Sequence, residues 1–239
     1  MGMNEATTSQ IYDLWSKIYD RSFGALVDHR YHRALEQMQL KSGDRVLDIG
    51  VGTGLMLRRY RQDVTVVGVD LSAGMLAKAA SKCREDHLSH CQLVRADAMM
   101  PPFPDRTFDH VMVSHALTVV SDPARLLHWA GRLVKPGGRI VLSNHFQSTY
   151  HVIAGLEKLL NPLFMKIGWR SDLALEDVLD GIDLEVDYSF RLQLLDVWQI
   201  VVLRRATPLH PDRLPPSSTK NQSNIEPTVT GTPLAMGSH

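Results

Sequence analysis

The stretch RVLDIGVGTG, from Arg45 to Gly54, places a short apolar run directly before three glycines spaced two residues apart. Asp48 lies near the end of the apolar run, and helical periodicity begins after the last glycine. Glycine lets the backbone turn tightly, and it lets a ligand lie directly against main-chain atoms. The stretch therefore predicts a strand, a ligand-binding loop and a helix in succession, as in the first unit of an α/β fold.

Apolar or β-branched runs alternate with helical periodicity through the middle of the chain, at residues 45–49, 64–69, 91–95, 108–113 and 139–143. This alternation predicts a parallel sheet that is covered by helices on both faces. Two later runs, 184–192 and 197–205, are too close together for a crossover helix, so they predict an antiparallel hairpin. We therefore expect a doubly wound, seven-stranded, mostly parallel α/β sheet with a C-terminal antiparallel hairpin.

The composition narrows the class of protein. A chain of 239 residues fits one sizeable domain with extensions at both ends. Lysine plus arginine and aspartate plus glutamate both total 26, which removes the overall basic field of a nucleic-acid binder. Cys83 and Cys91 are too few for a disulfide framework or a metal knuckle, and no apolar run approaches about 20 residues. We expect a cytoplasmic protein without a metal or nucleic-acid partner.

Acidic residues follow three successive predicted strands, and together they favour a nucleoside ligand. The loop reads G-x-G-x-G, not the dinucleotide pattern G-x-G-x-x-G, and Asp48 stands two residues before its first glycine. A carboxylate there opposes a pyrophosphate but suits S-adenosylmethionine, which carries an ammonium and a sulfonium. Asp70 is placed to accept both ribose hydroxyls, and Asp97 to accept from the adenine amino group. Each acid alone is also compatible with an ordinary solvated loop carboxylate.

In these features the chain resembles the class I S-adenosylmethionine-dependent methyltransferases. The matching motifs, between about residues 40 and 205, are VLDIGVGTG, VVGVDLS, RADA, FDHVMVSHAL and LVKPGGRIVLSN. The resemblance implies a Rossmann-like methyltransferase fold over residues 41–206 and S-adenosylmethionine as the cofactor. It also implies a set of cofactor-binding residues, which are Asp48, Gly50, Gly52, Gly54, Asp70, Leu71, Met75, Asp97, Ala98, Met99 and Ser114.

The stretch IYDLWSKIYDRSFG, residues 11–24, predicts an amphipathic N-terminal helix that is rich in aromatic rings. Such a helix can simply pack across the mouth of the sheet. Tyr12 and Tyr19 lie two turns apart on nearly the same bearing, so both hydroxyls can face one ammonium or amine. Arg30, His32 and Arg33 follow, and they are either a solvated basic face or contacts to anionic lipid. Residues 1–40 are therefore expected to form a lid that also contacts an anionic membrane surface.

Three shorter motifs, YDLWSKIYDRSF, VLSNHF and IGWRSDLAL, resemble the soluble, peripherally membrane-associated bacterial phosphatidylethanolamine N-methyltransferases. This second resemblance implies stepwise methylation of a phospholipid, from phosphatidylethanolamine to phosphatidylcholine. Tyr12 and Tyr19 would orient the amine, Asn144 would brace the site, and His145 or His115 would accept the proton. Arg170 and Arg33 would hold the substrate phosphate.

Two other functions share the same cofactor motifs. A small-molecule or quinone C-methyltransferase would need an activated carbon acceptor instead of an ammonium-binding cage. A regulatory protein that binds the cofactor without turnover would keep the same fold. Residues 207–239 are rich in Pro, Ser, Thr and Asn, so we expect a disordered tail, and its final Met-Gly-Ser-His is typical of an expression vector.

Overall fold

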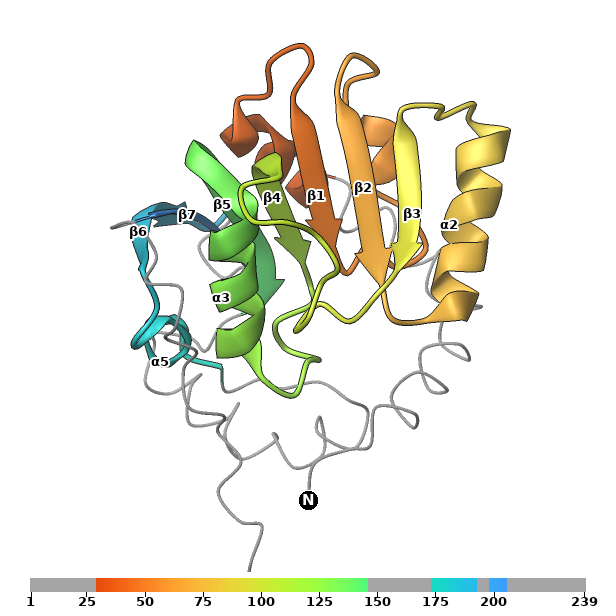
Figure 1. Cartoon of the computed structure of the whole chain (residues 1–239). Coiled ribbons are helices and arrows are strands. Elements are labelled where there is room, and N and C mark those ends of the chain that lie inside the picture. The colour runs from red at the N-terminus through yellow and green to blue at the C-terminus, as the bar shows by residue number, and fades with distance from the viewer. Residues whose placement is uncertain (1–28, 146–172, 193–197, 206–239) are drawn as a thin grey trace, which may run out of the picture.

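The computed structural model describes residues 29–145, 173–192 and 198–205. In these residues the chain forms one seven-stranded sheet with the order β3-β2-β1-β4-β5-β7-β6 (Figure 1). The predicted amphipathic helix and the predicted tail lie outside the described residues, as do Tyr12, Tyr19 and Arg170.

Five of the strands run parallel to one another, and they are β1 (Arg45–Ile49), β2 (Thr65–Asp70), β3 (Cys91–Arg95), β4 (Phe108–Ser114) and β5 (Val134–His145). The last two, β6 (Leu184–Phe190) and β7 (Trp198–Arg205), pair with each other antiparallel. β7 also pairs antiparallel with β5, so it lies between β5 and β6. The predicted α/β class, the seven strands and the terminal antiparallel pair are confirmed.

The helices begin where the sequence supplies capping groups. α2 (Ala73–Glu85) follows Ser72, whose hydroxyl accepts a hydrogen bond from the Met75 N–H at 3.2 Å. α3 (Pro123–Leu133) has proline in its first turn, and the Asp122 carboxylate accepts from the Arg125 N–H at 3.0 Å. Residues 29–38 are also helical, and two short elements complete the described helices, η1 (Leu57–Arg59) and α5 (Leu175–Leu179).

Alternation along the strands divides the core between the two faces of the sheet. In β1, Leu47 and Ile49 pack with buried residues of α3 and α5, whereas Val46 packs with the helical residues 29–38 and with α2. The second face holds buried side chains from the helical segment, which are Tyr31, Ala34, Leu35 and Met38. The helical residues 29–38 thus share a core with the strands that carry the glycine loop.

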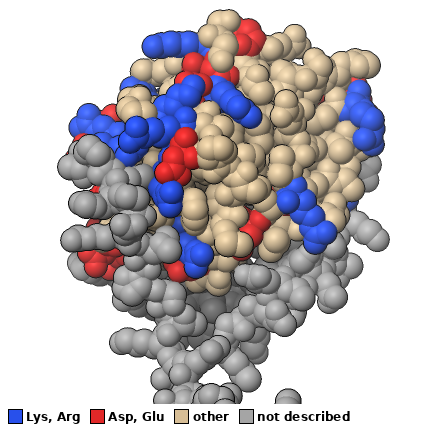
Figure 2. All heavy atoms as spheres, in the orientation of Figure 1, with Lys and Arg blue, Asp and Glu red and all other residues tan. Residues whose placement is uncertain are grey.

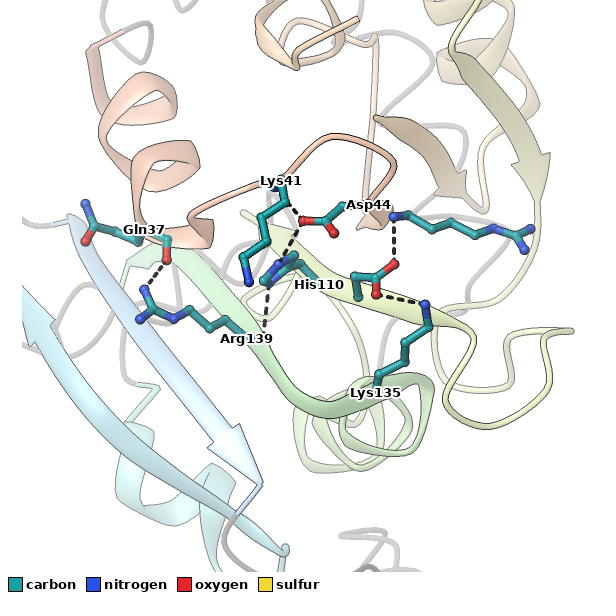
Figure 3. Close-up of polar contacts among 8 residues, drawn as sticks. Gln37, Lys41, Asp44, His110, Lys135 and Arg139 are labelled. Carbon is teal, nitrogen blue, oxygen red and sulfur yellow. Dashed lines mark hydrogen bonds and ion pairs between the residues drawn. The ribbon is translucent and has the colours of Figure 1, made fainter. Parts of the chain in front are cut away.

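A polar network joins the elements at the amino end of the parallel strands (Figure 3). The Arg139 guanidinium donates to the Gln37 carbonyl at 2.7 Å, which attaches the helical residues 29–38 to β5. His110 lies 3.4 Å from the Asp44 carboxylate and accepts from the Arg139 N–H at 3.2 Å. The Lys135 ammonium forms an ion pair with Asp109 at 2.8 Å. This network fixes the edge of the sheet opposite the glycine loop.

Charges on the surface are interleaved. Figure 2 shows basic and acidic side chains side by side on one face. Several charged side chains of the described residues form ion pairs, such as Arg132 with Asp105 at 2.9 Å. Such exposed pairs contribute little to stability. Within the described ranges, no helix is both long enough and apolar enough to cross a bilayer.

Candidate functional site

The glycine loop after β1 combines tight packing with one uncovered stretch of main chain. Gly50 has a φ of 74°, and a Cβ placed on it would lie 2.9 Å from the Ala116 Cβ. At Gly52 a Cβ would have only the Gly50 carbonyl within 4 Å, at 3.9 Å. Gly50 therefore permits the turn and the approach of the segment after β4, whereas Gly52 leaves room for a ligand to lie on the backbone.

Asp48 is a buried carboxylate with an unsatisfied oxygen, beside this loop. Its Oδ2 accepts a hydrogen bond from the Tyr60 hydroxyl at 3.1 Å, and its Oδ1 has no hydrogen-bond partner among the described residues. Burial raises the pKa of Asp48 to about 7, the Tyr60 hydrogen bond opposes this rise, and the nearby Asp70 charge adds to it. A cationic group at Oδ1 would satisfy both the missing contact and the buried charge, so the site fits the ammonium of S-adenosylmethionine.

Asp70 is held by two backbone amides at the end of β2. Its Oδ2 accepts from the Gly52 N–H and its Oδ1 from the Ser72 N–H, both at 2.9 Å. These contacts fix the plane of the carboxylate, and each oxygen can accept a second hydrogen bond, as a ribose diol requires. The neighbouring Leu71 is 40% exposed, which leaves an apolar surface beside the carboxylate, and Met75 is buried below it.

Asp97 begins the turn after β3. Its Oδ1 accepts from the Met99 N–H at 2.8 Å, and Ala98 packs against the core beneath the sheet edge. The Ala96 N–H donates to the Asp70 carbonyl at 3.2 Å, which brings the ends of β2 and β3 together. The structure therefore places the three predicted acids at one edge of the sheet, on three neighbouring strands.

Four further residues named from the sequence, Ser114, His115, Asn144 and His145, lie at the ends of β4 and β5. Ser114 is buried and its hydroxyl contacts the Met56 sulfur at 3.6 Å. Asn144 is fully buried in β5, next to His145, which ends the strand. His115 follows β4 with a φ of 55°, and its pKa is lowered to about 4, first by burial and then by the charge of Arg30. The His115 imidazole is therefore neutral at pH 7, and the residue after it, Ala116, packs on the glycine loop.

Arg33 lies on the exposed side of the helical residues 29–38. Its guanidinium forms an ion pair with Glu36 at 2.7 Å. In the part of the chain that the structure describes, no cluster of three His, Cys, Asp or Glu side chains is arranged to hold a metal ion.

Sequence reasoning missed three aromatic residues at this edge. Tyr60 binds Asp48, although nothing in the spacing of the glycine loop indicates such a partner. Tyr31 and Trp198 each contact the His115 ring, with centroids 6.0 Å apart in both pairs. Nothing in the sequence around Trp198 indicates a contact with His115. That contact arises because β7 runs antiparallel to β5, which brings the first residue of β7 to this edge.

Known proteins resemble this chain over most of its length. It is 38% identical over 179 residues to a phosphatidylethanolamine N-methyltransferase of Cereibacter sphaeroides, covering 74% of this chain and 87% of the relative. It is 33% identical over 187 residues to a demethylmenaquinone methyltransferase of Staphylococcus saprophyticus, covering 72% and 79%. The crystal structure of a phosphoethanolamine N-methyltransferase 2 of Haemonchus contortus, in complex with phosphomonomethylethanolamine and S-adenosylhomocysteine, has the same fold. It is 24% identical with a TM-score of 0.56, covering 66% of this chain and 38% of that one.

The fold is an α/β sheet whose carboxyl edge carries a glycine loop and three acids, an arrangement typical of proteins that bind an adenosyl cofactor. A family model described as a methyltransferase domain matches residues 47–142, which include the glycine loop and all three acids. The chain belongs to the class I S-adenosylmethionine-dependent methyltransferases, and its cofactor is S-adenosylmethionine.

Proposed function

We propose that this methyltransferase N-methylates phosphatidylethanolamine, stepwise through the mono- and dimethyl forms to phosphatidylcholine. The observation that carries the proposal is the 38% identity to the phosphatidylethanolamine N-methyltransferase, over 87% of that relative. The match covers 179 residues, more than the residues 47–142 that the methyltransferase-domain model matches.

The cofactor supplies an electrophilic methyl group when it is bound. Asp48 would bind its ammonium and Asp70 its ribose, while Asp97 with Ala98 would border the adenine. Leu71, Met75, Met99 and Ser114 complete the proposed pocket, with Gly50, Gly52 and Gly54 beneath it. These residues hold one reactant still, and positioning of this kind supplies much of the rate in a direct displacement.

On the acceptor side, Tyr12 and Tyr19 would orient the amine, and Asn144 would brace the site. The proton would go to His145 or His115, directly or through water. A pKa of about 4 makes His115 a weak base, so His145 is the better candidate. Arg170 and Arg33 would hold the phosphate. As the nitrogen becomes quaternary it loses its donors, and aromatic rings still attract it through their faces.

Because the proposed acceptor is a membrane lipid, we also propose that the protein acts at a membrane surface. Residues 1–40, which precede the methyltransferase domain of residues 41–206 in the sequence, would form a lid. This lid would also contact an anionic membrane surface reversibly. The protein would be cytoplasmic and peripheral, and residues 207–239 would be a disordered tail.

A second candidate is C-methylation of a quinone precursor, because a demethylmenaquinone methyltransferase is 33% identical over 79% of its length. The two acceptors differ in chemistry. A quinone precursor is flat and carries no ammonium or phosphate, whereas the phospholipid headgroup carries both.

Radiolabelled methyl transfer separates the candidates. Purified protein is incubated with labelled S-adenosylmethionine and, in separate reactions, with phosphatidylethanolamine or demethylmenaquinone in detergent micelles. The proposal expects label in three successively methylated phospholipids and none in the quinone. Asp70→Ala provides the matched inactive control, because its change removes the ribose contact. Label in the quinone alone would replace the proposal by the second candidate, and no transfer to either acceptor would contradict both.

A further inference from the structure

Tyr60 comes from the same stretch of chain as the glycine loop. The Leu57 N–H donates to the Gly54 carbonyl at 3.1 Å, so the loop leads directly into η1. Leu57 is fully buried, and its carbonyl accepts from the Tyr60 N–H at 3.3 Å, where η1 ends. The side chain of Tyr60 is buried as well. This turn brings the Tyr60 hydroxyl back to β1, at 3.1 Å from the Asp48 Oδ2.

Among the described residues, this hydroxyl is the one hydrogen-bond donor to the Asp48 side chain. The other carboxylate oxygen, Oδ1, is buried and has no hydrogen-bond partner there. Burial raises the pKa of Asp48 to about 7, the Tyr60 hydrogen bond lowers it, and the Asp70 charge raises it. Tyr60 is thus the one described group that favours the charged form of this acid.

Two further titratable groups face the pair from other elements. The Cys91 thiol of β3 and the Tyr31 phenol of the helical residues 29–38 both interact with the Tyr60 hydroxyl electrostatically. Burial raises the pKa of Cys91 to about 12, so this thiol is neutral at pH 7. Burial, followed by the Asp48 charge, raises the pKa of Tyr60 well above its ordinary value of 10.0. The Tyr60 hydroxyl therefore keeps its proton and stays a donor at neutral pH.

A neutral donor suits a carboxylate that must receive a cation. A lysine or arginine in the place of Tyr60 would neutralise Asp48 and repel the ammonium of the cofactor. A phenol stabilises the charged acid through a charge-assisted hydrogen bond, and it adds no charge of its own. It also occupies Oδ2, so Oδ1 is the oxygen that a bound ammonium would satisfy.

We propose that Tyr60 is a positioning residue for the cofactor: its hydroxyl holds the Asp48 carboxylate in the charged form, with Oδ1 left for the ammonium of S-adenosylmethionine. This inference rests on the proposed role of Asp48 and deepens the proposed function, because it names a residue that controls cofactor binding through another side chain. The effect of Tyr60 should therefore depend on the charge of Asp48 and on the charge of the ligand.

The test measures equilibrium binding of two ligands to the full chain by calorimetry, between pH 6 and pH 8.5. S-adenosylhomocysteine carries the α-ammonium, and 5′-methylthioadenosine has the same adenosine without it. The variant is Tyr60→Phe, which removes only the hydroxyl. Tyr188→Phe is the matched control, because the Tyr188 hydroxyl donates to the Gln37 Oε1 at 2.8 Å from β6, at the end of the sheet opposite β3.

Without the hydroxyl, the pKa of Asp48 should rise above 7, so a smaller fraction of this acid is charged near neutral pH. We expect Tyr60→Phe to weaken S-adenosylhomocysteine binding by about tenfold at pH 6 and by less than about threefold at pH 8.5. Comparing variant and wild type at one pH cancels the titration of the ligand itself. Binding of 5′-methylthioadenosine should change by less than about twofold at either pH. Tyr188→Phe should bind both ligands as the wild type does.

Two further measurements separate this effect from a loss of packing. In an Asp48→Asn background, Tyr60→Phe should change the affinity for S-adenosylhomocysteine by less than about twofold, because no carboxylate remains to be held. In carbon-13 NMR of the cofactor-free protein, the carboxyl signal that Asp48→Asn lacks should titrate near pH 7 in the wild type. The same signal should titrate at higher pH in Tyr60→Phe.

Four results would overturn the inference: unchanged S-adenosylhomocysteine binding by Tyr60→Phe, a loss that is the same at every pH, equal losses for the two ligands, or an unchanged carboxyl titration. A uniform loss or equal losses would mean that Tyr60 acts by packing. None of these measurements contains an acceptor. If Tyr60→Phe behaves as expected in a protein that methylates demethylmenaquinone and not phosphatidylethanolamine, the proposed function fails and the role of Tyr60 stands.

Discussion

Cofactor affinity should depend on pH through one buried carboxyl group, that of Asp48. Its pKa of about 7 means that the group is about one-tenth ionised at pH 6 and about half ionised at pH 7. If only the carboxylate binds the ammonium of the cofactor, the dissociation constant at pH 6 should be about tenfold above its limiting value. The α-amino group of the cofactor has an ordinary pKa of about 7.7–8.0. Above that pH it loses its positive charge, so the affinity for Asp48 should fall again.

The same carboxyl group should destabilise the cofactor-free protein at neutral pH. The folded-state pKa of about 7 exceeds the ordinary value of 3.8, so the folded protein binds more protons between these two values. The free energy of unfolding therefore falls as the pH rises from about 4 to 7, by on the order of 4 kcal/mol in total. Asp48→Asn cannot ionise, and Tyr60 can still donate to its amide oxygen. At pH 8 this variant should be more stable than the wild type without cofactor.

Calorimetric titration with S-adenosylmethionine between pH 5.5 and 8.5 checks the first effect, and urea denaturation at pH 5 and pH 8 checks the second. Asp48→Asn should bind the cofactor weakly, without the rise in affinity between pH 6 and 7. An affinity that is flat across this interval in the wild type, or a rise that persists in the variant, would refute the reasoning about Asp48.

Asp70→Asn should weaken binding of S-adenosylhomocysteine by about 1–3 kcal/mol, and an unchanged dissociation constant in calorimetry would contradict the ribose assignment. Gly50→Ala should lower the free energy of unfolding by roughly 2–4 kcal/mol, because the new Cβ meets the Ala116 Cβ at 2.9 Å. Gly137→Ala, with a similar φ of 79° but no atom within 4 Å, should cost only about 1 kcal/mol, so equal urea midpoints would count against the packing argument. His115→Asn should leave the acid limb of the kcat profile in place, because a pKa of about 4 keeps this ring neutral above pH 5. A displaced limb would make His115 the proton acceptor.

The strands were predictable because buried parallel strands are short apolar runs between turn residues. β1 and β3 begin and end at the predicted residues, β2 is shifted by one residue at both ends, and β4 ends one residue later than predicted. β5 differs most, since it begins at Val134 and not at residue 139, and it ends two residues later than predicted, whereas β6 ends two residues earlier. Pro136, Gly137 and Gly138 read as a turn, yet Val134 still pairs with Phe108 across a register shift. Turn-forming residues can hide a strand that is interrupted but not ended.

The grouping of the three acids was predictable from the sequence, whereas the ring contacts around them were not. Acids that follow successive parallel strands must share an edge, so sequence order alone brings Asp48, Asp70 and Asp97 together. The contacts of Tyr60, Tyr31 and Trp198 depend on side-chain directions and on the order of strands at the other end of the sheet. No local pattern encodes those, so they appear only in the folded chain.

The reversed strand β7 has a consequence for how such enzymes diversify. Because β7 runs against β5, its first residue, Trp198, reaches the same edge as the last residues of β4 and β5. The three acids that we propose to bind the donor nucleoside follow or end β1, β2 and β3, on the other half of the sheet. Under the proposed function, substitutions on the β7 side would change the surroundings of the acceptor and leave the three acids of β1 to β3 untouched, which is one way for a single fold to serve different acceptors.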